Sequence, residues 1–202
     1  MCGFAGFVGE VENREQVLEN MIDTIIHRGP DSSGKFVDED AALGFRRLSI
    51  IDLSESGDQP LYNEDRSKVL VFNGEIYNYQ ELREELIQAG HTFVSNTDSE
   101  TLIHGYEQWG EELVYRLRGM YAFAIWDQRG KRLFSARDIF GIKPLYYAQM
   151  NGTLMFGSEI KSFLEHPKFD KVFNEDALGN YLSFQFVPTN ETFFKGVFCV
   201  QP

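Results

Sequence analysis

The chain has 202 residues, of which 43% are hydrophobic and 14% aromatic, and its formal net charge is −12. This size allows one large domain or two small ones with a buried core. The excess of Asp and Glu (31) over Lys and Arg (19) disfavours nucleic acid and anionic membrane surfaces as partners.

Cysteine and histidine usage indicates the compartment and argues against a metal. The two cysteines, Cys2 and Cys199, stand at opposite ends of the sequence, whereas a disulfide framework normally uses more. The opening "MCGFAGFVG" lacks the positive charge and apolar length of a secretory signal. We therefore expect a reducing, cytoplasmic location. The four histidines are scattered without zinc-binding spacing, so we expect no metal in this chain.

The first half of the chain mixes strand and helix patterns. Apolar spacing, β-branched residues and turn signals distinguish the two. Asn78 is expected to cap one helix, and Asp98 or Ser99 to open the next. The predicted strands are residues 4–8, 41–53 and 68–79, and the predicted helices are 14–28, 78–90 and 97–110.

The second half is dominated by short strands that are typical of antiparallel hairpins. These strands are predicted over 121–127, 132–138, 144–149 and 153–158, with helices over 159–166 and 175–184. Because strands and helices do not alternate regularly, the pattern favours an α+β fold in layers. The tail has no clear period. We expect a domain over residues 1–190, and in 191–202 the start of a connection to a further domain that is absent here.

Cys2 is a candidate nucleophile if Met1 is removed. Its own α-amino group would then have a pKa of about 7.7–8.0, which suits a general base near neutral pH. The amine can take the thiol proton and return it to a leaving amine, so that no histidine is needed. The alternative is a small buried thiol at the start of a strand.

Five other residues match the needs of an amide substrate. Asn73 and Gly74 end a predicted strand and could donate to an oxyanion, although an "NG" pair is also a common turn. Arg47 could bind an α-carboxylate, or be only a solvated charge. Asp98 could hold an α-ammonium together with Glu75, or only cap a helix.

Eight motifs in order resemble the class II glutamine amidotransferases, and more closely the glutaminase domain of glutamine-hydrolysing asparagine synthetases. They run across nearly the whole chain: Cys2-Gly3, "HRGPD" (27–31), "RLSIID" (47–52), "NGEIYN" (73–78), "SNTDSE" (95–100), "LRGMYAFAIWD" (117–127), "ARDIFGIKPLYY" (136–147) and "GSEIKSF" (157–163). Eight ordered motifs are much more specific than any one of them.

The resemblance implies a fold and a site. The fold is the four-layer αββα sandwich of N-terminal nucleophile hydrolases. The catalytic residues would be Cys2, Asn73 and Gly74. Glutamine would be bound by Arg47, Leu48, Ser49, Ile50, Ile51, Asn73, Gly74, Glu75 and Asp98. "RGPDSSG" is expected to be a structural turn, and Arg137 and Asp138 are expected to brace a hairpin connection.

The resemblance also implies partners and leaves two alternatives open. A covalently linked synthetase domain would use ATP and magnesium to make asparagine from aspartate. No cofactor is expected in this chain, and a homodimer is possible. The same glutaminase could instead serve another amide-forming synthetase. A binding domain that has lost catalysis is the other alternative, although such relatives usually lack the second-position cysteine.

Overall fold

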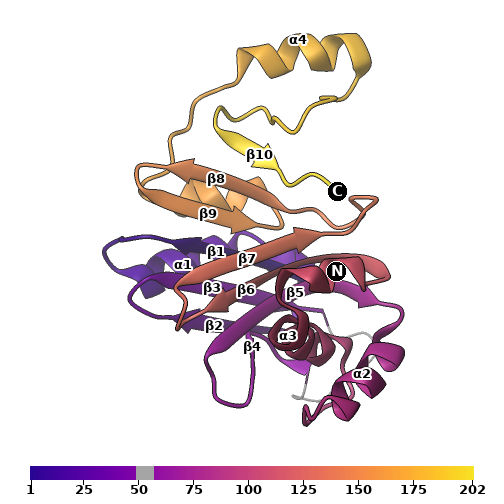
Figure 1. Cartoon of the computed structure of the whole chain (residues 1–202). Coiled ribbons are helices and arrows are strands. Elements are labelled where there is room, and N and C mark those ends of the chain that lie inside the picture. Colours follow the sequence, from indigo (N-terminus) through magenta and orange to yellow (C-terminus); the bar gives the residue numbers. More distant parts are fainter. Residues whose placement is uncertain (49–56) are drawn as a thin grey trace.

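Two antiparallel sheets form the centre of the computed structural model, which describes residues 1–48 and 57–202 (Figure 1). The first sheet has the order β10 (Val197–Cys199), β8 (Tyr146–Met150), β9 (Thr153–Gly157), β1 (Gly3–Val8), β3 (Ala41–Arg47) and β2 (Ser32–Val37). The second has the order β4 (Leu61–Tyr62), β5 (Lys68–Ile76), β6 (Gly119–Asp127) and β7 (Arg132–Arg137).

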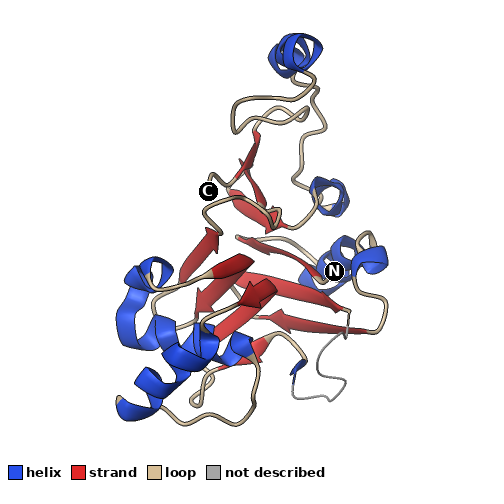
Figure 2. Ribbon diagram, turned by 90° about the vertical axis from the view of Figure 1, so that its right-hand side faces the viewer, coloured by secondary structure: helices blue, strands red, loops and turns tan. Residues whose placement is uncertain are grey.

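Helices cover the outer faces of the stacked strands (Figure 2). The covering helices are α1 (Arg14–Asp23), α2 (Tyr79–Gln88) and α3 (Asp98–Trp109). The chain also forms α4 (Glu175–Phe184) and the 3-10 turns η1 (Ile26–Arg28), η3 (Gly110–Tyr115) and η4 (Ile160–Glu165). Helix α4 stands apart from the sheets in Figure 1. No helix in the described ranges combines the length and apolar character that a bilayer crossing requires.

Three apolar clusters separate the layers. Helix α1 and η4 pack on one face of the six-stranded sheet through residues such as Leu18 and Phe163. The two sheets meet through a cluster that includes Phe45 and Val71. Helices α2 and α3 pack on the outer face of the four-stranded sheet. The layers therefore run helix, sheet, sheet, helix, which confirms the predicted αββα sandwich.

The hairpins predicted in the second half are confirmed, since β6 pairs with β7 and β8 with β9, both antiparallel. The helix predicted over 14–28 is shorter. Helix α1 ends at Asp23, where the Thr24 hydroxyl donates to the Met21 carbonyl (2.7 Å), and the chain tightens into η1. The α-helix predicted over 159–166 is likewise replaced by the 3-10 turn η4 (Ile160–Glu165).

Three edge strands in the described ranges, β2, β4 and β10, were not predicted from the sequence, and β2 begins inside the "RGPDSSG" segment that was expected to be a turn. Strand β10 pairs with β8, so the tail is ordered where the pattern indicated only a connection. Asn78 does stand at the N-cap position of α2, but its side chain makes no capping bond there. Instead, its amide donates to the Arg116 carbonyl and its oxygen accepts from the Arg118 amide, both at 2.9 Å.

Candidate active site

Cys2 lies at the entrance to β1, half-buried at the edge of the cluster between the two sheets. Its Sγ is 3.4 Å from the Leu48 amide, which donates to it, and 3.6 Å from the Leu48 carbonyl, to which the thiol donates. Strands β1 and β3 run antiparallel, and the register that pairs Gly3 with Arg46 places Cys2 beside Leu48. The thiol and the start of the predicted binding segment are thus neighbours.

A charged pair holds the backbone at Cys2. Arg28 Nε donates to the Cys2 carbonyl (3.0 Å), and Arg28 Nη1 donates to Glu159 Oε1 (3.1 Å). Gly3 makes room for this arginine, since a Cβ on Gly3 would lie 2.8 Å from Arg28 Cδ. The two motifs "HRGPD" and "GSEIKSF" therefore meet at Cys2, and they supply contacts to its backbone that the sequence did not reveal.

Asn73 offers a free donor on the same side as Cys2. Residues alternate along β5, so Asn73 shares its face with Val69 and Val71, which belong to the cluster against which Cys2 packs. Asn73 is 2% exposed, and its Nδ2 has no hydrogen-bond partner among the described residues. A buried amide is costly to leave unpaired, so an unpaired one points to a ligand or a functional role.

Asn73 and Gly74 lie within β5, not at its end as predicted, and the pair forms no turn. Close packing requires the glycine. A Cβ at this position would lie 2.3 Å from the Met120 carbonyl oxygen on the neighbouring strand β6. Any side chain would therefore push the two strands apart. The expected donation of the Gly74 amide to an oxyanion stays a prediction.

Asp98 joins the end of β5 to the start of α3. Its Oδ2 accepts a hydrogen bond from the Ile76 amide (2.9 Å). Burial raises the pKa of Asp98, and the nearby charge of Glu75 raises it further. The hydrogen bonds that Asp98 accepts from backbone amides lower the pKa in part. The structure thus brings Glu75 and Asp98 together, with Glu75 exposed to solvent.

Arg47 is the last residue of β3 and is 7% exposed. Its Nη1 is 2.8 Å from Asp58 Oδ1, and a Cβ on Gly57 would lie 2.5 Å from its Nη2. Its guanidinium therefore faces the segment that follows residue 56. Three predicted binding residues, Ser49, Ile50 and Ile51, lie outside the described residues.

Arg137 and Asp138 brace the connection between β7 and β8, but this connection crosses from one sheet to the other and is not the hairpin that was predicted. The buried Asp138 carboxylate accepts from the amides of Tyr121, Phe140, Ile142 and Lys143 at 2.9–3.2 Å. These bonds hold the pKa of Asp138 below its ordinary value despite burial. Arg137 Nε donates to the Lys143 carbonyl (2.6 Å), and its Nη1 donates to the Val200 carbonyl (2.9 Å).

The fold defines a class. An αββα sandwich of two antiparallel sheets is the fold predicted above for N-terminal nucleophile hydrolases. Two solved structures share this fold. A Bacillus subtilis glutamine phosphoribosylpyrophosphate amidotransferase bound to ADP and GMP has a TM-score of 0.69 and 23% identity, covering 80% of this chain and 43% of its own. A structure described as the allosteric regulatory enzyme of purine biosynthesis has a TM-score of 0.71 and 22% identity. The match covers 81% of this chain and 43% of that chain.

The chain belongs to the glutamine amidotransferase domain family, whose model matches residues 1–202. Asparagine synthetase [glutamine-hydrolyzing] 1 of Bacillus subtilis is 47% identical over 207 residues, which cover 100% of this chain and 32% of that protein. Asparagine synthetase [glutamine-hydrolyzing] of Zea mays is 44% identical over 167 residues, which cover 80% of this chain and 28% of that protein. The chain therefore spans about a third or less of the length of these relatives.

Proposed function

We propose that the chain hydrolyses L-glutamine to glutamate and ammonia, with Cys2 as the nucleophile. The observation that carries this proposal is the buried Asn73 amide, which has no hydrogen-bond partner among the described residues and faces the cluster that Cys2 joins. An amide donor of this kind stabilises the oxyanion that forms when a thiolate attacks an amide carbon.

The proposed reaction requires the removal of Met1, which frees the α-amine of Cys2. The amine takes the thiol proton, and Sγ attacks the side-chain amide carbon of glutamine. The oxyanion that forms is stabilised by Asn73 Nδ2 and the Gly74 amide. The amine then gives its proton to the leaving nitrogen, so that ammonia departs and a thioester remains. Water, deprotonated by the same amine, attacks the thioester and releases glutamate and the thiol.

The charged ends of glutamine have candidate partners at the two strand ends. Arg47 would take the α-carboxylate in place of the Asp58 carboxylate that it contacts at 2.8 Å. Glu75 and Asp98 would hold the α-ammonium, because both are acidic and lie close together. Leu48, and residues 49–51 beyond the described range, would line the same pocket.

We further propose that the ammonia serves asparagine synthesis from aspartate in a linked synthetase domain that uses ATP and magnesium. The support is the naming of the relatives and the short share of their length that this chain covers. A boundary at 190/191, a homodimer and a cytoplasmic location also stay predictions. The alternative is that the ammonia serves another amide-forming synthetase, which would need the same glutaminase chemistry.

A glutaminase assay on the purified chain tests the proposal. We expect glutamine-dependent release of glutamate and ammonia in equal amounts, and loss of this activity in Cys2→Ala. Cys199→Ala serves as the matched control, since Cys199 lies on β10 and should keep the activity. Hydrolysis that survives Cys2→Ala would contradict the assignment. Absence of hydrolysis in the wild-type chain, with glutamine still bound, would favour the silent binding domain.

A further inference from the structure

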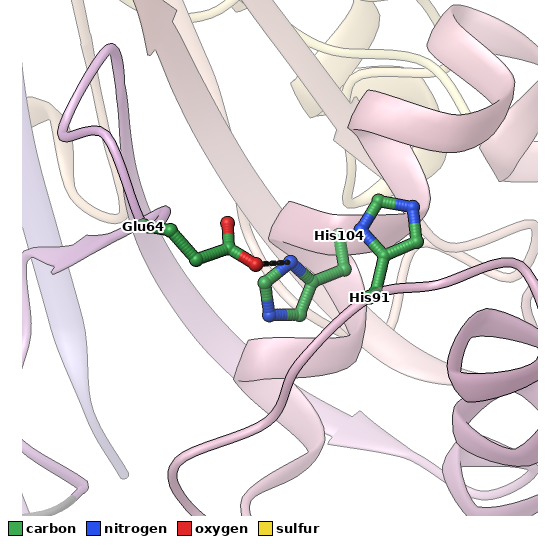
Figure 3. A group of neighbouring side chains, drawn as sticks. All are labelled: Glu64, His91 and His104. Carbon is green, nitrogen blue, oxygen red and sulfur yellow. Dashed lines mark ion pairs between the residues drawn. The ribbon is translucent and has the colours of Figure 1, made fainter.

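A second group of polar side chains lies on the outer side of the four-stranded sheet. Glu64 comes from the turn between β4 and β5, His91 from the connection between α2 and α3, and His104 from α3 (Figure 3). One nitrogen or oxygen of each lies within 4.8 Å of the others. Because three separate segments supply these residues, their spacing along the chain carried no metal signal.

His104 is oriented by a carboxylate behind it. Its Nε2 is 3.6 Å from Glu100 Oε1. Glu100 is itself fixed, because its two carboxylate oxygens accept from the Val94 and Ser95 amides, both at 2.7 Å. The other ring nitrogen, Nδ1, faces Glu107 Oε2 (3.3 Å) and Glu64 Oε1 (3.7 Å). A carboxylate that holds one imidazole nitrogen while the other is presented is the usual support of a metal-binding histidine.

The neighbouring donors are supported in the same way. His91 Nε2 is 3.1 Å from Gln108 Oε1, which leaves its Nδ1 for another partner. Glu107 Oε1 accepts from Asn63 Nδ2 (2.7 Å), and its Oε2 faces His104. His91 and Glu107 are thus each held by the protein through one polar atom.

The charge at this place also favours a cation. Glu64, Glu100 and Glu107 surround His104, which is only 2% exposed. These three carboxylates gather around one buried side chain, and a divalent ion would balance their negative charge.

We propose that Glu64, His91 and His104 form a binding site for a divalent cation of the zinc class, with Glu107 beside it. Two imidazoles and one carboxylate suit a tetrahedral zinc ion that keeps an open fourth position, whereas magnesium and calcium prefer oxygen ligands alone. The ion would tie the β4–β5 turn and the α2–α3 connection to α3. Helix α3 begins at Asp98, which is proposed above to bind the substrate glutamine, so the ion would also stabilise the helix that carries this residue.

Calorimetric titration of the chelator-treated chain with zinc chloride tests the site. The Cys2→Ala, Cys199→Ala background removes competing thiols. We expect one ion per chain, and an affinity lowered by about 10-fold or more in Glu64→Gln and in His91→Asn. Glu64 is half exposed (51%), so its replacement should not disturb folding. Glu84→Gln and His27→Asn, which alter the same residue types outside the group, are the matched controls.

Two results would overturn the proposal. One is zinc affinity that is unchanged in both Glu64→Gln and His91→Asn, or lowered equally by the controls. The other is magnesium binding as tightly as zinc at this place. Circular dichroism of each variant shows whether it is folded before its affinity is compared.

Discussion

Asn73 is the residue whose replacement separates catalysis from binding. Asn73→Ala should lower kcat by about 10²- to 10³-fold, the usual loss for one oxyanion donor, and leave KM for glutamine nearly unchanged. Its Nδ2 makes no hydrogen bond with the described residues, so the variant should lose little stability. Steady-state kinetics and thermal unfolding measure both effects. Asn180→Ala on α4 is the control, and an equal loss of kcat there, or a rise in KM alone at Asn73, would contradict the role.

His166 should make the stability of the chain depend on pH. It is 2% exposed beside the Phe7 ring (centroids 4.8 Å apart), and burial lowers its pKa to about 4. A histidine in the unfolded chain titrates near pH ~6.5, so the unfolded state binds more protons between these values. Stability is therefore full above about pH 6.5 and falls as the pH drops toward 4.

Urea unfolding at pH 7 and pH 4.5 measures this effect. The loss attributable to His166 should be on the order of 2–3 kcal/mol, and His166→Leu should lose less stability between the two pH values than the wild type. The comparison with His166→Leu removes the contribution of the carboxylates that titrate in the same range. Equal losses in the two proteins would show that His166 does not titrate as its burial implies.

At the scale of elements, the approach of α3 to β5 shapes the proposed binding site. Asp98→Asn keeps an oxygen for the Ile76 amide but removes the charge, so KM for glutamine should rise by roughly 10- to 100-fold. The change in kcat should be small, because the substrate ammonium does not change its charge during the reaction. Asp176→Asn, in the first turn of α4, is the matched control. An unchanged KM in Asp98→Asn would remove Asp98 from the binding site.

Elements with a strong local pattern could be predicted from the sequence, and elements that depend on distant partners could not. Capping residues and apolar patterns located α2, α3 and α4, and runs of apolar and β-branched residues located β5 and β6. The short edge strand β10 exists because β8 provides its partner, and three residues carry no pattern of their own. In the same way, the resemblance indicated Cys2 and Asn73, whereas the bond from Arg28 to the Cys2 carbonyl joins residues far apart in the sequence.

At the scale of the whole molecule, the chain contains a proposed acyl-transfer site but no phosphate-binding loop of the kind that would activate aspartate with ATP. The 202-residue chain, given glutamine, aspartate, ATP and magnesium, should release glutamate and ammonia without consuming ATP. Ammonia should appear in the solvent, because no linked synthetase is present to use it. Chromatography of the amino acids and an assay for pyrophosphate check this outcome. Detectable asparagine would show that the proposed boundary at residue 190 is wrong.

The claim that Cys2 is an N-terminal nucleophile is tested most directly by mass spectrometry after reaction with a glutamine-like electrophile. The intact mass should show that Met1 is absent from active protein, and peptide mapping should place one adduct on Cys2 and none on Cys199. Excess glutamine should protect Cys2 from labelling. An adduct mainly on Cys199, or full glutaminase activity in protein that retains Met1, would contradict the account.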